Sequence, residues 1–94
     1  MKTPITAIDY IDNAIEITTQ RHNDCPAFQT YSSCLIQLEF IKNVLLGIEK
    51  DKARLHRLTI GAWAGKEFDG EDPELAKALA IASWIAEQIA QGLK

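Results

Sequence analysis

Carboxylates are concentrated in one short stretch of this sequence, and their density makes it the first place to look for chemistry. The stretch reads Glu67-Phe-Asp-Gly-Glu-Asp-Pro-Glu74, and five of its eight residues are acidic: Glu67, Asp69, Glu71, Asp72 and Glu74. We call residues 67–74 the acidic corner. Such a cluster can cap a helix, bind a hard cation or meet a basic partner, and each use requires a different spacing.

Helix capping accounts for part of the acidic corner. Asp72 precedes Pro73, and aspartate is a favoured N-cap residue while proline is tolerated at the first helical position. Glu74 adds favourable negative charge to the first turn of that helix. The three carboxylates before Asp72 exceed what capping needs. They could meet Arg or Lys on a partner, where complementary charge speeds encounter and fixes orientation. The sequence leaves solubility and partner contact equally open for them.

Two tryptophans could extend such a contact. Trp63 lies four residues before Glu67, so the two share a face if the helix between them is regular. An exposed aromatic beside acidic groups is typical of a binding hot spot. Burial in the core is the alternative for Trp63, and equally for Trp84. The predicted partner-binding residues are Trp63, Glu67, Asp69, Glu71 and Asp72.

Motifs for catalysis or metal binding are not found. The sequence contains no P-loop, dinucleotide-binding glycine pattern, nucleophile elbow or HExxH. His56 has no evident nucleophile or partner beside it, so a structural histidine is the preferred interpretation over a general base. The acidic corner lacks the longer loop and alternating ligands of an EF-hand. Cys25 and Cys34 do not form a zinc set with the histidines. We therefore expect no catalytic residue, cofactor or metal, with Cys34 buried and Cys25 a free, partly exposed thiol.

Composition narrows the class of protein. The chain has 94 residues, 47% hydrophobic and 24% charged, which predicts one globular domain over residues 1–94. Its net charge of −3 argues against nucleic acid, whose phosphates require a basic surface. The first residues lack the apolar core of a signal peptide, and no apolar run approaches the ~18 residues of a membrane span. We expect a cytoplasmic protein that does not contact a membrane.

Helical periodicity accounts for most of the chain, and no strand pattern is found. Four helices are predicted: from Thr3, or alternatively Thr6, to about Asn23; from about Thr30 to Ile48; from Lys52 to Phe68; and from Pro73 to Gly92. Their short connections predict an all-α, antiparallel four-helix bundle. The wide apolar stripe of the second helix places it centrally between two neighbours. Its stripe and the alanine-rich last helix leave a homodimer possible.

Individual positions within these helices carry further expectations. Ile8, Ile11 and Ile15 should form the buried face of the first helix, for which Thr6 followed by Asp9 offers a start of capping-box type. The apolar residues of the last helix also recur with helical period: Leu75, Leu79, Ala82, Ile85, Ala86 and Ile89. Gly61 and Gly65, four residues apart, should allow a neighbouring helix or Trp84 to approach closely. Phe68 should be a core residue that anchors the acidic corner.

The sequence resembles a family of immunity proteins of bacterial type VI secretion, which neutralise NAD(P)-degrading effector toxins. The resemblance is most specific at His56-Arg-Leu-Thr-Ile-Gly61, Lys66-Glu-Phe68 and Asp72-Pro-Glu-Leu75. The segments Pro4-Ile, Asp9-Tyr-Ile-Asp12 and Leu38–Leu46 are similar in character. Chain length and helix count also agree, so the resemblance covers nearly the whole chain.

This resemblance implies a non-enzymatic antitoxin made beside its toxin. Such a protein binds the toxin domain in the cytoplasm and occludes its catalytic cleft. The two other hypotheses are a helical adaptor for an unrelated protein partner, and an enzyme or small-ligand binder that uses His56 and the carboxylates. A toxin gene next to the gene of this chain would favour the antitoxin hypothesis over the adaptor hypothesis.

Overall fold

The fold consists of helices and their connections throughout the part of the chain that can be described. The structure is a computed structural model, and it describes residues 6–50, 55, 58, 60–63, 66, 68 and 70–91. The helices are α1 (Ala7–Asp24), α2 (Gln29–Leu45), α3 (Ile60–Trp63) and α4 (Pro73–Ala90). The described residues include no strand. The predicted all-α class is confirmed.

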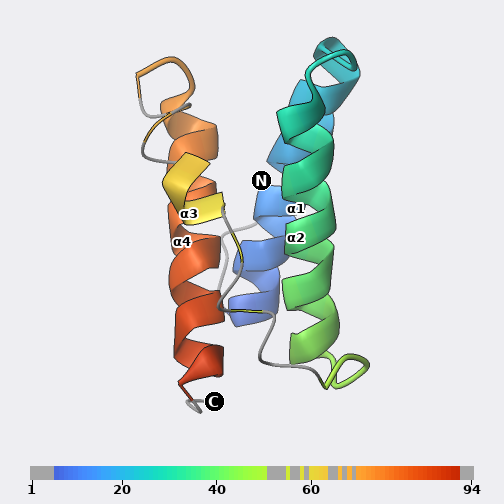
Figure 1. The fold of residues 1–94 in the computed structure, drawn as a ribbon, viewed down its shortest axis with the longest axis vertical. Helices are drawn as coiled ribbons and strands as arrows, with labels where there is room; N and C mark the ends of the chain where they lie inside the picture. The colour runs from blue at the N-terminus through green and yellow to red at the C-terminus, as the bar shows by residue number, and fades with distance from the viewer. Residues whose placement is uncertain are drawn as a thin grey trace.

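Helix α1 lies at the centre of the bundle. In Figure 1, α1 ascends while α2 and α4 descend, so α1 is antiparallel to both, and it packs against both of them. The short α3 lies along α4. Among the described residues, α2 packs mainly on α1 and touches α4 only slightly, so the central helix there is α1 and not the predicted second helix.

Helix α1 begins at the second of its two predicted starts. The Asp9 N–H donates to Thr6 Oγ1 at 3.2 Å, and the Thr6 N–H donates to Asp9 Oδ2 at 3.3 Å. These reciprocal bonds form a capping box, which satisfies two amide groups that lack a helical partner. Thr3 lies outside the described residues.

The buried face of α1 is rotated from the predicted one. Ile11 is fully buried, whereas Ile8 and Ile15 are only partly buried, and the other buried positions are Ala14, Ile17 and Thr18. The buried Thr18 hydroxyl is not left unpaired, because it donates to the Ala14 carbonyl at 2.7 Å. A pattern search that counts only large apolar residues misses this face, since its centre uses alanine and threonine.

Helix α2 contributes a core seam of Cys34, Leu38, Ile41 and Val44, but it ends earlier than predicted. Gly47 adopts a left-handed φ of 79°. Its N–H donates to the Val44 carbonyl and the Ile48 N–H donates to the Asn43 carbonyl, which is the Schellman pattern for ending a helix. Ile48 consequently lies outside the helix and is 73% exposed.

The third and fourth helices differ in how well they were predicted. The prediction of a continuous helix over 52–68 is wrong at Leu58, which lies outside any helix. Helix α3 is described only at Ile60–Trp63. Several residues of that range, Gly65 and His56 among them, lie outside the described residues, as does Gly92. The α4 prediction is confirmed: its buried residues include the predicted Leu75, Leu79, Ala82, Ile85, Ala86 and Ile89.

Close packing of α3 on α4 depends on Gly61. A Cβ at this position would lie 2.5 Å from Ser83 Oγ and 3.1 Å from Ser83 Cβ. The prediction that Gly61 allows close approach is confirmed, with Ser83 rather than Trp84 as the neighbour.

Candidate partner-binding surface

Aromatic packing fixes the beginning of the acidic corner. Phe68 is 4% exposed, as predicted for an anchor. Its ring stacks on Tyr31 with centroids 5.8 Å apart and an interplanar angle of 11°, and Phe28 packs edge-on against Tyr31 at 5.0 Å. Offset aromatic pairs of this kind add about 0.5–1.5 kcal/mol beyond the buried area. Phe68 is thereby tied to the start of α2.

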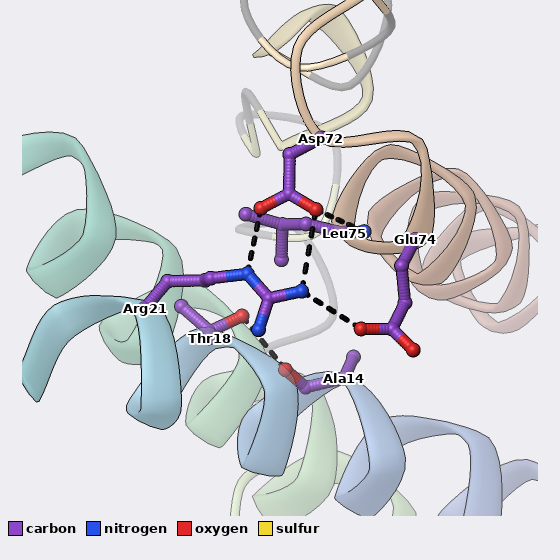
Figure 2. A network of polar contacts seen from close by, with 6 residues as sticks. All are labelled: Ala14, Thr18, Arg21, Asp72, Glu74 and Leu75. Carbon is purple, nitrogen blue, oxygen red and sulfur yellow. Dashed lines mark hydrogen bonds and ion pairs between the residues drawn. The ribbon is translucent and has the colours of Figure 1, made fainter. Parts of the chain in front are cut away.

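An ion-pair network fixes the end of the corner. Figure 2 shows the Arg21 side chain reaching from α1 to two carboxylates at the start of α4. Arg21 Nε donates to Asp72 Oδ2 at 2.7 Å, while Arg21 Nη2 donates to Asp72 Oδ1 at 3.3 Å and to Glu74 Oε1 at 2.7 Å. The planar guanidinium presents its donors in the fixed geometry that such a fork requires.

Asp72 serves two partners at once. Its Oδ1 also accepts the Leu75 N–H at 3.3 Å, so Asp72 is the N-cap of α4 as predicted. The hydrogen bonds from Arg21 lower the pKa of Asp72 below its ordinary value, against the opposing effect of burial. They likewise raise the pKa of Arg21. Both groups therefore remain charged across the neutral range.

Between the two fixed ends, the described residues Gly70 and Glu71 form a turn that faces solvent. A recess of about 560 Å³ adjoins this turn, lined by Phe28, Tyr31, Lys66, Phe68, Glu71 and Asp72. Burial, and then the charge of Asp72, raise the pKa of Tyr31, so its hydroxyl stays protonated in the recess. The recess therefore joins aromatic and charged side chains beside an exposed carboxylate.

The predicted contact residues divide into three groups. Glu71 is exposed. Asp72 is only 18% exposed at its side chain and is bonded to Arg21. Glu67, Asp69 and the side chain of Trp63 lie outside the described residues, so their part in a contact stays a prediction.

Arg21 is the functional candidate that sequence reasoning missed. It lies 51 residues before Asp72, and no local pattern links the two positions. The available signal was its place in the last turn of a helix, where a cation is favourable but also common.

A second exposed feature lies away from the acidic corner. Trp84 is 60% exposed, so the core alternative does not hold for it. It lines an apolar groove of about 320 Å³ between α1 and α4, together with Thr6, Ala7, Tyr10, Ile81 and Ile85. Cys25 is exposed and Cys34 buried, as predicted, and neither forms a disulfide.

Comparison with known proteins decides the family. The Tsi6 family model matches residues 6–88. The chain belongs to the Tsi6 family. Its relatives include the immune protein Tsi6 of Pseudomonas aeruginosa, which is 41% identical over 90 residues, with 96% of each chain covered. This membership confirms the resemblance to immunity proteins.

Solved structures of the Tsi6 family share the fold. A chain in the structure of Tse6 in complex with Tsi6 matches with a TM-score of 0.91 at 41% identity, covering 96% of both chains. The structure of Tsi6 from Pseudomonas aeruginosa matches with a TM-score of 0.83 at 40% identity, covering 87% of this chain and 95% of that one.

Two further observations concern the described residues of this Tsi6-family chain. No helix among them is both long and apolar enough to cross a bilayer. They also contain no group of three or more His, Cys, Asp or Glu side chains arranged to hold a metal ion.

Proposed function

We propose that this Tsi6-family chain is an immunity protein that binds the toxin domain of a cognate effector and occludes its active site. The observation that carries the proposal is the match to Tsi6 over 96% of both chains, together with the solved complex of Tse6 with Tsi6. The chain acts by stoichiometric binding in the cytoplasm and catalyses no reaction.

The effector in this proposal is of the NAD(P) glycohydrolase type. A cleft that holds the phosphates of a dinucleotide must be cationic, so carboxylates on a rigid body can occupy it in place of the ligand. The contact residues that we propose are Trp63, Glu67, Asp69, Glu71 and Asp72. Glu71 is exposed beside the recess, and Asp72, the next residue, caps α4 by accepting the Leu75 N–H.

A binding and inhibition experiment tests the proposal. The probe is the toxin domain encoded beside the gene of this chain, with Tse6 as a second probe. We expect an equimolar complex that abolishes hydrolysis of NAD(P) by the toxin. Glu67→Lys with Asp69→Lys should weaken the complex while leaving the helical circular dichroism unchanged.

A matched control changes charge elsewhere. Glu39 on α2 and Glu87 on α4 are both exposed, and Glu39→Lys with Glu87→Lys makes the same change in net charge. This control should bind as the wild type does. Equal affinity of the wild type and the corner variant would remove the acidic corner from the contact, while a chain that neither binds nor inhibits would refute the antitoxin function.

A further inference from the structure

We infer that Arg21 is a positioning residue for the partner-binding surface, because it holds the exposed Gly70-Glu71 turn in the conformation that meets the toxin. The inference rests on the proposed function. It concerns a residue on α1 that faces the base of the corner and need not touch the toxin itself.

The turn is closed at its base. The Asp72 N–H donates to the Phe68 carbonyl at 2.7 Å, which joins the two residues on either side of the turn. Phe68 is held by stacking on Tyr31, and Asp72 is held by Arg21. The ends of the turn are therefore fixed to different helices, α2 and α1.

Gly70 and Glu71 do not contribute to the buried core of the fold. Gly70 and Glu71 are exposed, and a Cβ built on Gly70 meets no atom within 4 Å. A segment with fixed ends and free side chains can dock without first being ordered. Pre-ordering of this kind raises affinity because the conformational entropy is already lost before binding.

Arg21 is the part of this arrangement most open to a specific test. Its side chain is only 26% exposed, and it bonds to both Asp72 and Glu74. Loss of its charge makes the corner more negative, which on its own would strengthen attraction to a cationic cleft. Loss of positioning would weaken binding. The two effects have opposite signs, so the direction of the change identifies the cause.

The experiment measures affinity for the toxin domain encoded beside this gene, with Arg21→Gln as the main variant. The matched control is Lys42→Gln, which removes the same charge and another ion pair between helices, from Lys42 Nζ to Asp12 Oδ1 at 2.7 Å. All measurements are made at a temperature where circular dichroism shows each variant folded. We expect Arg21→Gln to weaken binding about tenfold, the effect of re-ordering about one backbone residue, and Lys42→Gln to stay within about twofold.

A double-mutant cycle with Glu71→Gln separates positioning from general destabilisation. If Arg21 positions Glu71, then Glu71→Gln should cost at least about threefold less in the Arg21→Gln background than in the wild type. Additive losses, unchanged affinity in Arg21→Gln, or an equal loss in the Lys42→Gln control would each overturn the inference. A wild-type chain that does not bind overturns the proposed function and this inference with it, whereas binding with additive losses overturns this inference alone.

A milder variant covers the case in which Arg21→Gln does not fold. Glu74→Ala removes one branch of the network at a side chain that is 62% exposed, and it leaves the Asp72 cap of α4 intact. Amide hydrogen exchange of Asp72, whose N–H donates to the Phe68 carbonyl at the base of the turn, should speed up in this variant and not in Lys42→Gln. Unchanged exchange at this amide would contradict the positioning role.

Discussion

The ion pair between Arg21 and Asp72 makes a defined prediction about stability and its dependence on pH. Asp72→Asn keeps an oxygen that can cap α4, since asparagine is as good an N-cap as aspartate. It replaces the oxygen that accepts from Arg21 Nε at 2.7 Å with an amide donor. The variant therefore separates the ion pair from the cap.

The expected loss follows from the bonds that change. A hydrogen bond to a charged group contributes about 1.5–3 kcal/mol, and Glu74 still accepts from Arg21 Nη2 in the variant. We expect Asp72→Asn to lower the free energy of unfolding by about 2 kcal/mol at pH 7. Asp72→Ala should cost about 1 kcal/mol more, because the cap is also lost. For a domain whose total stability is about 5–14 kcal/mol, this is readily measured.

The pH dependence has a definite sign. Arg21 lowers the pKa of Asp72 in the folded protein, below the value of about 3.9 expected in the unfolded chain. The stability contributed by the charged carboxylate is therefore complete well above pH 4, and it is lost as the pH falls through the lowered pKa. The difference in stability between the wild type and Asp72→Asn should shrink in that acidic range.

The assay is urea unfolding followed by circular dichroism at 222 nm, between pH 7 and pH 2.5. Other carboxylates titrate in both proteins, so the difference between the two curves isolates Asp72. A difference that stays constant down to pH 2.5 would refute the argument, as would an Arg21→Gln, Asp72→Asn double variant that loses the full sum of the single losses.

Three further predictions concern packing and reactivity. Gly61→Ala should destabilise the protein by about 1–2 kcal/mol in urea unfolding, because the new Cβ crowds Ser83. The control Gly70→Ala places its Cβ in open space, so the free energy of unfolding should stay unchanged or rise by about 0.4–1 kcal/mol. Equal effects at the two glycines would contradict the packing of α3 on α4. Thr18→Val should change the free energy of unfolding by less than about 1 kcal/mol, because valine keeps the shape of this fully buried side chain and the Ala14 carbonyl can still accept a backbone hydrogen bond within the helix. Thr18→Ala should lower the free energy of unfolding further, because it opens a cavity. A thiol reagent should label Cys25 in the folded protein and Cys34 only after unfolding, so rapid labelling of both thiols without denaturant would disprove the burial of Cys34.

The sequence predicted most reliably the features that depend on nearby residues. The capping box of Thr6 and Asp9, the Asp72-Pro73 start of α4 and the apolar face of α4 all use spacings of three or four positions, which the chain displays directly. Family resemblance at residues 55–75 likewise led to the Tsi6 family. Such signals can be read without knowing the fold.

The features that were missed depend on contacts between distant segments or on small residues. The end of α2 was placed too late because Leu45 and Ile48 continue the apolar spacing, while the left-handed conformation of Gly47 ends the helix. The central position of α1 was missed because Ala14 and Thr18 carry little hydrophobic signal. Arg21 was missed because its carboxylate partners, Asp72 and Glu74, are distant in the sequence and come close to it only in the folded chain.

The bond from Arg21 to Asp72 also bears on the stage of synthesis at which the chain can bind its partner. The corner receives its support from a helix near the beginning of the chain, but the carboxylate that accepts this support comes 51 residues later. Under the contact proposed above, an emerging chain that has completed α1 and α2 still lacks the turn that would meet the toxin. Truncated copies that end before the start of α4 should therefore fail to bind it.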